Sequence, residues 1–244
     1  MIIEHNISHC LQPTNFTCGH ASLSMILSHF GQHVSPESLM PEITAFRDQN
    51  GDVCGTLTPW ICSWALENGF AVELYCSDSE LLDLSWASLD SKDMIERMRL
   101  ARETRTLASL NQASVHKYFD SYIEFIERGG LLSISPYISS ELIDNLLSRA
   151  PILATFAYSA LYGIGRTRSV GLRESVPDDL KGTTTTHAAV IFGRTEGGDY
   201  RIADPYIPAR FHVAPRDAVV AAIAAASYLC ESQIALVYPA MSEG

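Results

Sequence analysis

The stretch LQPTNFTCGHASLSMIL, residues 11–27, sets a polar, turn-prone run against a helix-like run, with Cys18 at the junction. In the first turn of a helix, unpaired N–H groups and the positive end of the dipole favour an anion such as a thiolate. A thiolate that attacks a carbonyl also needs donors for the resulting oxyanion. Gln12, on the loop before the helix, can supply an amide donor. Taken alone, the same residues also fit a surface glutamine and an ordinary thiol.

A histidine and an aspartate that suit such a cysteine occur far downstream, in TTTTHAAVIFGRTEGGDYRIADP, residues 183–205. The pattern predicts a β-hairpin that turns near 196–198, with His187 on its first strand and Asp204 at the end of its second. Folding the hairpin brings the carboxylate towards the imidazole and can fix its orientation as a general base. Asp199 competes for this role, but it lies in the predicted turn, where aspartate is common for local reasons. We therefore favour Asp204.

These residues resemble the pattern of a known family: Gln12, then Cys18-Gly19 at the start of the ASLSMIL helix, His187 in HAAVIFG and Asp204 in ADP. Their order and spacing are similar to those of papain-like cysteine peptidases of the double-glycine (bacteriocin) leader peptidase type. The resemblance implies a papain-like fold. It also implies Cys18 as nucleophile, His187 as general base and acid, Asp204 as the group that orients the histidine, and Gln12 as oxyanion donor.

The order of the predicted elements is that of an α+β protein, helical first and strand-rich later. We expect helices over residues 18–30, 36–40, 58–68 and, after an N-cap at Ser139 or Ser140, in SSELIDNLLSRA. We expect strands in FAVELYC (70–76), PILATFAYSA (151–160), THAAVIFG (186–193), YRIADP (200–205) and IALVYP (234–239). Residues 77–128 carry charged, helix-periodic segments, and the resemblance, which covers 5–76 and 150–206, does not include them. We therefore expect one papain-like domain, 1–244, with an N-terminal helical half, a C-terminal antiparallel sheet half and a helical insertion at about 77–128.

Composition narrows the classes of partner. The net charge of −11 at pH 7 repels phosphate backbones and anionic lipid surfaces, so we expect neither nucleic acid nor membrane as a partner. No apolar run is long enough to span a membrane, and the first ten residues, MIIEHNISHC, do not have the pattern of a secretory signal. We therefore expect a cytoplasmic protein.

The remaining cysteines and histidines indicate no metal centre. The 6 cysteines are irregularly spaced and form no CxxC pair, so neither a disulfide framework nor a structural zinc site is predicted. His5, His9 and Cys10 cluster near the N-terminus, but nothing downstream completes a ligand set. The glycine-rich run GIGRTRSVGLRES, residues 163–175, has no phosphate-binding pattern, and we interpret it as a mobile loop near the cleft. We expect no cofactor and no metal.

Two further features have an ordinary and a functional interpretation. Arg99, Arg102 and Arg105 recur at three-residue spacing and can either bind a substrate carboxylate or pair with neighbouring glutamates on a solvated helix face, and we favour the second. ERGG, residues 127–130, has the form of a double-glycine cleavage site, but a helix end explains it better.

The sequence thus predicts a thiol-dependent hydrolase that cleaves a peptide or another small amide substrate through a covalent acyl-enzyme. The same triad is compatible with a papain-like acyltransferase, which passes the acyl group to an amine or thiol. A non-catalytic peptidase-like binding module is a third possibility, although such modules typically lack the nucleophile or the base. The sequence does not indicate an oligomeric state.

Overall fold

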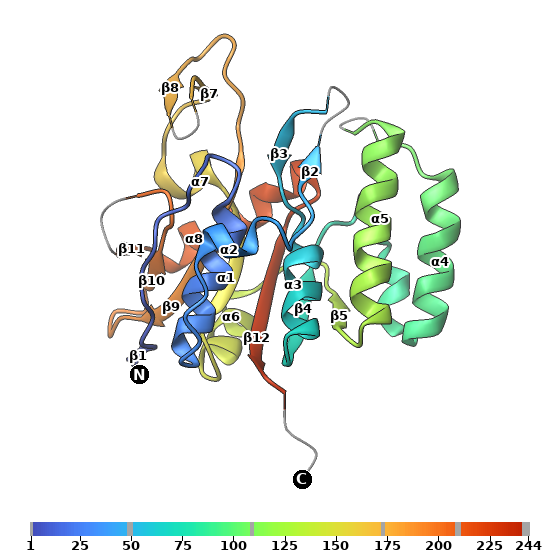
Figure 1. The fold of residues 1–244 in the computed structure, drawn as a ribbon, viewed down its shortest axis with the longest axis horizontal. Coiled ribbons are helices and arrows are strands. Elements are labelled where there is room, and N and C mark those ends of the chain that lie inside the picture. Colours follow the sequence, from blue (N-terminus) through green and yellow to red (C-terminus); the bar gives the residue numbers. More distant parts are fainter. Residues whose placement is uncertain (1, 48–50, 108–109, 172–173, 208–210, 241–244) are drawn as a thin grey trace.

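The computed structural model describes residues 2–47, 51–107, 110–171, 174–207 and 211–240. Its centre is a sheet in the order β11-β10-β9-β6-β12-β4-β5 (Figure 1). A short additional strand, β1, pairs with the end of β9 at Gly193 and Arg194, beyond the part of β9 that pairs with β6. Neighbouring strands are antiparallel except for β4 and β5. The strands of this sheet are β1 (Ile3–Glu4), β4 (Phe70–Cys76), β5 (Leu131–Ile134), β6 (Ile152–Ala157), β9 (Thr186–Arg194), β10 (Tyr200–Ala203), β11 (His212–Ala214) and β12 (Gln233–Pro239).

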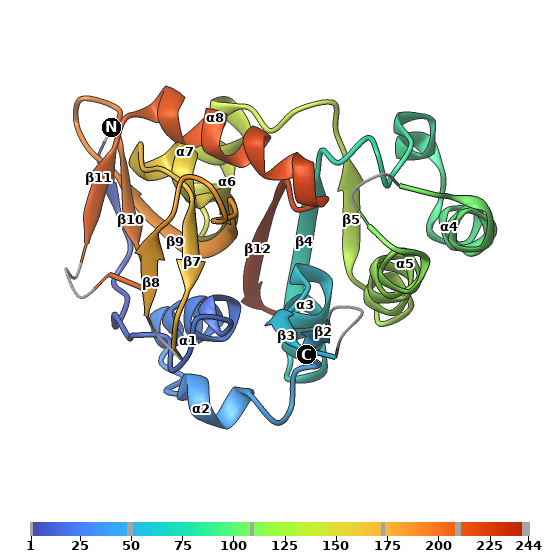
Figure 2. The same cartoon turned by 90° about the horizontal axis from the view of Figure 1, so that it is seen from above.

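Helices cover both faces of the sheet (Figure 2). On one face lie α1 (Cys18–His29), α2 (Pro36–Leu39), α3 (Thr58–Glu67) and α5 (Gln112–Glu127), with α4 (Ser91–Thr104) packed outside α5. On the other face lie α6 (Ser140–Leu147), α7 (Tyr158–Tyr162), α8 (Arg216–Ala225) and the short turn η2 (Ala226–Leu229). Each face has its own apolar core, one that includes Leu23, Ile61 and Phe119 and one that includes Leu146 and Val219. This arrangement confirms the predicted α+β class.

Helix α1 is the most enclosed helix near the nucleophile, because every residue from Gly19 to Leu27 is buried. A helix that is buried all round belongs inside a protein, and α1 packs on β9 and β6, with α2 and α3 also against it. The predicted helix ended at residue 30, and the structure ends it at His29, followed by Gly31 in the left-handed region at φ 77°. The burial of α1 and its packing against the sheet and the neighbouring helices fix the position of Cys18.

The described residues of the segment 77–128 are mostly helical, as their charge pattern predicted, and the segment connects β4 to β5. Because parallel neighbours require a long crossover, this connection accounts for the parallel β4–β5 pair, which departs from the antiparallel sheet that we predicted. The segment holds the turn η1 (Leu84–Ser88) and the pair α4 and α5, which lies at the β5 end of the sheet (Figure 1). Within it, α5 also packs against α3, so the pair is attached to the helical face.

One predicted strand is too long and one predicted loop is partly ordered. The strand predicted over 151–160 ends at Ala157, because Tyr158 begins α7, a one-turn helix that Gly163 ends in the left-handed region at φ 63°. The run 163–175, predicted as a mobile loop, contains β7 (Thr167–Ser169), which pairs with β8 (Ser175–Pro177). A second small hairpin, β2 (Phe46–Arg47) with β3 (Val53–Gly55), stands beside α3.

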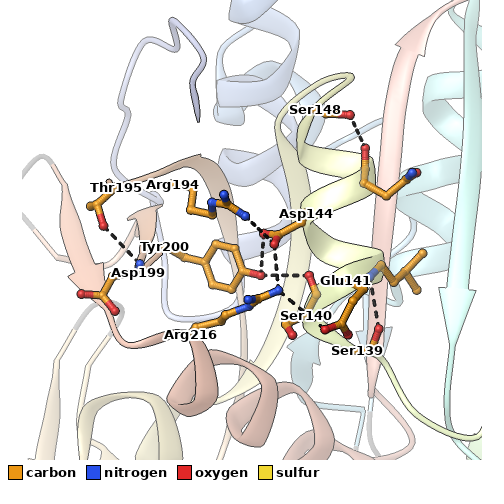
Figure 3. A network of polar contacts seen from close by, with 12 residues as sticks. Ser139, Ser140, Glu141, Asp144, Ser148, Arg194, Thr195, Asp199, Tyr200 and Arg216 are labelled. Atoms are coloured by element: carbon orange, nitrogen blue, oxygen red, sulfur yellow. Dashed lines mark hydrogen bonds and ion pairs between the residues drawn. The ribbon is translucent and has the colours of Figure 1, made fainter. Parts of the chain in front are cut away.

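A polar network fixes the turn end of the β9–β10 hairpin (Figure 3). The Asp144 carboxylate on α6 accepts hydrogen bonds from Arg194 Nη1 at 2.5 Å, Arg216 Nη2 at 2.8 Å and Tyr200 Oη at 3.0 Å. These donors come from the end of β9, from α8 and from β10. One half-buried carboxylate therefore joins four elements, and it holds the hairpin that carries His187.

Candidate active site

Cys18 is the first residue of α1, as predicted, and its side chain is half-buried. The residue before it, Thr17, gives the helix no side-chain cap, because its hydroxyl donates to the Thr14 carbonyl at 3.1 Å. The first N–H groups of a helix have no intrahelical acceptor, and here no hydroxyl or carboxylate at the N-cap takes their place. Cys18 therefore lies at the uncapped, positive end of the α1 dipole.

His187 and Asp204 meet at the end of the β9–β10 hairpin. His187 Nε2 lies 2.8 Å from Asp204 Oδ1, and the two side chains are only 8% and 1% exposed. Cys18 and His187 line the same pocket, and the Cys18 side chain favours the charged imidazole. The structure thus brings together Cys18, His187 and Asp204, the three residues that the sequence predicted as a triad.

The charge of the pair follows from its surroundings. Burial disfavours an imidazolium at His187, but the charge and hydrogen bond of Asp204, with the Cys18 side chain, outweigh it and raise the pKa of His187 to about 10. Burial also disfavours the Asp204 carboxylate, and the charge and hydrogen bond of His187 reverse this effect, so the pKa of Asp204 is lowered. At neutral pH the arrangement therefore favours an imidazolium held between a carboxylate and the thiol.

Additional donors hold Asp204 in place. The Tyr162 hydroxyl donates to Asp204 Oδ2, and the Tyr206 N–H donates to Oδ1 at 2.7 Å. His9 Nε2 lies 2.8 Å from the Asp204 backbone carbonyl. The rings of Tyr158 and Tyr206 stand edge-on to His187, with centroids at 5.2 and 6.4 Å. These contacts fix the carboxylate and shield the imidazole from water.

A hydrogen bond attaches helix α1 to β9 one turn beyond Cys18. The Ser22 hydroxyl donates to the carbonyl of Ala188, the residue after His187, at 3.1 Å. On the other side, Gly19 lets α3 approach closely, because a Cβ at this position would lie 2.2 Å from Ile61 Cδ1. Cys18 is therefore placed by packing against both the sheet and α3.

Gln12 is 1% exposed and lies on the loop that leads into α1. Its Nε2 donates to the Thr14 carbonyl at 2.6 Å, and its backbone N–H donates to the Pro205 carbonyl at 2.9 Å, next to Asp204. An amide nitrogen carries two hydrogens, so this bond leaves one for another acceptor. Oε1 has no hydrogen-bond partner within the described parts of the chain. The side-chain amide of Gln12 is thus bound to its own loop, and its backbone N–H is bound to the segment after Asp204. The bond from the side chain to Thr14 was not predicted.

A pocket opens at Cys18. Its lining comes from the loop before α1 and the start of α1, from β3 and the loop after it, and from α3, β6 and β9. Glu231, in the turn before β12, completes the lining. Thr58 and Thr155 line it and lie within hydrogen-bond distance of each other, with their hydroxyl oxygens 3.3 Å apart. The pocket also includes one carboxylate, Glu231, which the sequence analysis did not single out.

Several other candidates lie apart from this site. Asp199 stays in the hairpin turn, where its N–H donates to Thr195 Oγ1 at 3.1 Å. His20 is buried, and burial lowers its pKa to about 4. Arg99 and Arg102 pair with the acidic residues of α4 and α5, and Arg105 donates to the Glu80 carbonyl, so all three serve the helical segment.

The described ranges contain no group of three His, Cys, Asp or Glu side chains placed to hold a metal ion. No helix within them is both long and apolar enough to cross a membrane. The predictions of a cytoplasmic location and of no nucleic-acid partner remain predictions.

Tyr162, His9 and Glu231 are the contributors that the sequence analysis missed. Tyr162 lies in a segment predicted as the end of a strand and the start of a loop, and Glu231 follows Cys230, whose left-handed backbone at φ 58° no local pattern announces. A metal-binding role for His9 was set aside in the sequence analysis, and its contact with the Asp204 carbonyl was not predicted. A clue was available only for Tyr162, because YGIG is typical of a helix end at glycine.

No protein-family model and no curated protein matches this chain. Among solved structures, a candidate C39-like peptidase from Bacillus anthracis is similar over 100% of both chains, with 13% sequence identity and a TM-score of 0.50. At this identity the similarity concerns the fold and not the activity or the individual site residues. The chain therefore has the papain-like α+β fold of a C39-like peptidase, as the sequence predicted.

Proposed function

We propose that the protein is a cysteine peptidase-like hydrolase that cleaves a peptide or another amide bond. The observation that carries the proposal is the alignment of Cys18, at an uncapped helix start, with the buried His187–Asp204 pair. An imidazolium next to a thiol stabilises the thiolate, which is the nucleophile. The fold shared with a candidate C39-like peptidase supports the same reaction class.

In the first step, the Cys18 thiolate forms a C–S bond to the carbonyl carbon of the substrate. The C–N bond breaks as the His187 imidazolium gives its proton to the leaving amine. Gln12 contributes its remaining amide hydrogen to the oxyanion, together with an N–H group at the start of α1. Asp204 keeps the imidazole in place during both proton transfers.

In the second step, water attacks the thioester and passes one proton to His187. A C–O bond forms, the C–S bond breaks, and the imidazolium–thiolate pair returns. An amine that takes the place of water would make the protein an acyltransferase, and cleavage after a double glycine would make it a leader peptidase. Both finer assignments remain predictions from the sequence.

The test is alkylation of Cys18 at about pH 6, where ordinary thiols are almost fully protonated. The protein is treated with iodoacetamide and the labelled cysteine is identified by peptide mass spectrometry. We expect Cys18 to react first, since burial raises the pKa of Cys62, Cys76 and Cys230. His187→Ala should slow the reaction of Cys18, because the imidazolium that stabilises its thiolate is lost.

Incubation with a peptide pool extends the test to the reaction itself. An acyl adduct on Cys18 that decays in water supports hydrolysis, and an adduct that is consumed faster when glycinamide is added supports transfer. Labelling that is no faster at Cys18 than at an ordinary exposed thiol, and that ignores His187→Ala, would overturn the proposal.

A further inference from the structure

Glu231 is a carboxylate in the pocket that the mechanism above does not use. It is half-buried and shares the lining with Cys18, Thr186 and His187. The backbone around it is well fixed. Its own N–H donates to the Ala226 carbonyl at 3.3 Å, and the carbonyl of Cys230 accepts from the Gln233 amide at 3.1 Å. The position of this acid is therefore built into the turn between η2 and β12.

The partners of Glu231 are neutral. The Tyr118 hydroxyl, on α5, lies 2.9 Å from the Leu229 carbonyl and 3.4 Å from Glu231 Oε1 and donates to both. Thr186, the residue before His187, lines the same pocket, and its hydroxyl favours the charged carboxylate. Hydroxyl groups orient a carboxylate but do not neutralise it.

No lysine or arginine within the described ranges forms an ion pair with Glu231. Arg105 lies close enough to affect Cys230, but its Nε donates to the Glu80 carbonyl at 2.8 Å. Asp78, whose charge acts on Glu231, has the same sign. Burial, with the charge of Asp78, raises the pKa of Glu231 to about 7. Within the described ranges this half-buried carboxylate thus has no lysine or arginine as counter-ion, and His187, the cation that lines the same pocket, pairs with Asp204.

We propose that Glu231 is a specificity residue that binds a cationic group of the substrate, such as a lysine or arginine side chain or an amine, next to the bond that Cys18 attacks. The ligand supplies a positive charge that no lysine or arginine in the described ranges provides. The net charge of −11 attracts the same class of substrate. This inference rests on the proposed function, because it concerns the substrate of the same pocket.

Tyr118 is the positioning residue in this arrangement. It is 4% exposed, so its ring belongs to the core of the helical face, while its hydroxyl reaches the pocket acid. The helical segment 77–128, which the family resemblance did not cover, thereby takes part in substrate choice through a single hydroxyl.

The experiment uses peptide acyloxymethyl ketones, which alkylate an active-site thiolate as their carboxylate leaves. Each tetrapeptide probe carries either lysine or the uncharged norleucine at one position, and the rate of Cys18 labelling is measured by mass spectrometry. In the wild-type protein we expect one position at which lysine reacts about tenfold faster than norleucine, the effect of one charge-assisted contact. In Glu231→Gln this ratio should fall to about one.

Two variants separate the contact from other effects. Glu196→Gln removes the same charge from the exposed hairpin turn, so it controls for the net charge and should keep the full lysine preference. Tyr118→Phe keeps the buried ring and removes the hydroxyl, and we expect the lysine-to-norleucine ratio to fall by about half, a change that a purely structural role would not produce.

The outcomes distinguish the two proposals. Probes that label Cys18 in a His187-dependent manner but show no lysine preference at any position in the wild-type protein would overturn the role of Glu231 and leave the proposed function intact. An unchanged lysine preference in a folded Glu231→Gln variant would do the same. Failure of every probe to label Cys18 ahead of other cysteines would overturn the proposed function itself.

Discussion

The residues around the pocket fall into two groups of different origin. The proposed catalytic group, Cys18 with His187 and Asp204, was predicted from the sequence, while the proposed specificity group, Glu231 with its partner Tyr118, was visible only in the fold. The catalytic group consists of chemically distinctive residues at the ends of elements. The specificity group joins a helix of the crossover segment to the turn before the last strand. The comparison teaches that candidate nucleophile, base and orienting residues can be recognised from local sequence patterns, whereas the contact between Glu231 and Tyr118 becomes visible only when distant segments meet.

The largest effect that tests this difference between the two groups is expected from removal of the nucleophile. Cys18→Ala should lower the rate constant for every substrate by ~10⁴ or more, because no covalent intermediate can form. Substitution of Glu231 should instead change the order of preference among substrates. Single-turnover assays with lysine and norleucine peptides measure both effects. A Cys18→Ala variant that retains lysine-dependent turnover would place the chemistry elsewhere in the molecule.

The second prediction concerns the orientation of the imidazole. Asp204→Asn should slow turnover by ~10³, because the amide can hold the wrong tautomer of His187 and no longer favours its charged form. The Tyr206 N–H can still donate to the amide oxygen of the variant, so we expect the fold to persist. Asp199→Asn is the matched control and should be nearly silent, because Asp199 lies in the hairpin turn. The reverse ranking in steady-state assays would remove Asp204 from the catalytic group.

The contrast between these two aspartates shows how far sequence reasoning reached. The hairpin pattern distinguished Asp204 from Asp199 because strand and turn positions differ in their local chemistry, and α1 was predicted because its start and its glycine end are local signals. Tyr162 and Tyr118 could not be assigned to the site in this way. Their hydroxyls reach it only because α7 follows β6 directly and because α5 packs onto the sheet. The parallel β4–β5 pair also depends on a crossover rather than on the pattern of either strand.

The third prediction tests the oxyanion donor. Gln12→Ala should lower kcat by ~10² to 10³ with little change in KM, because the amide acts mainly on the transition state. Gln32→Ala, an exposed glutamine just after α1, is the control. An unchanged kcat would show that the bond from Gln12 to Thr14 is purely structural and that the N–H groups of α1 suffice.

The fourth prediction concerns the pH dependence of stability that arises from His20, which lies on the same helix as Cys18. His20 is 4% exposed and burial lowers its pKa to about 4, so the folded protein binds this proton at lower pH than the unfolded chain. Stability supported by neutral His20 is complete above the ordinary histidine pKa near 6.5 and is lost as pH falls towards 4. From about pH 7.5 to about pH 5 the loss from this group is about 2 kcal/mol.

Urea unfolding of the wild-type protein and of His20→Phe at the two pH values measures that loss. The variant should lose about 2 kcal/mol less than the wild type between them. Equal losses would mean that other groups govern the acid response, and His20→Gln provides a second comparison should the larger ring disturb α1.

The smallest expected effect links the nucleophile to the opposite wall of the pocket. A methyl group at Gly19 would lie 2.2 Å from Ile61 Cδ1, so Gly19→Ala forces the end of that side chain to move. We expect a loss of about 1 kcal/mol in the free energy of unfolding, since overpacking is partly offset by the better helix propensity of alanine. Ile61→Val alone should also cost about 1 kcal/mol, because it leaves a small cavity. Combined, the two changes exchange one methyl group for another, and the double variant should be more stable than the sum of the single effects by about 1 kcal/mol.

A double-mutant cycle from urea unfolding measures this coupling, and the rate of Cys18 alkylation in the same four proteins shows whether the coupling affects the thiol. Strictly additive free energies would mean that α1 and α3 adjust independently, and the placement of Cys18 would then depend on its contacts with the sheet alone.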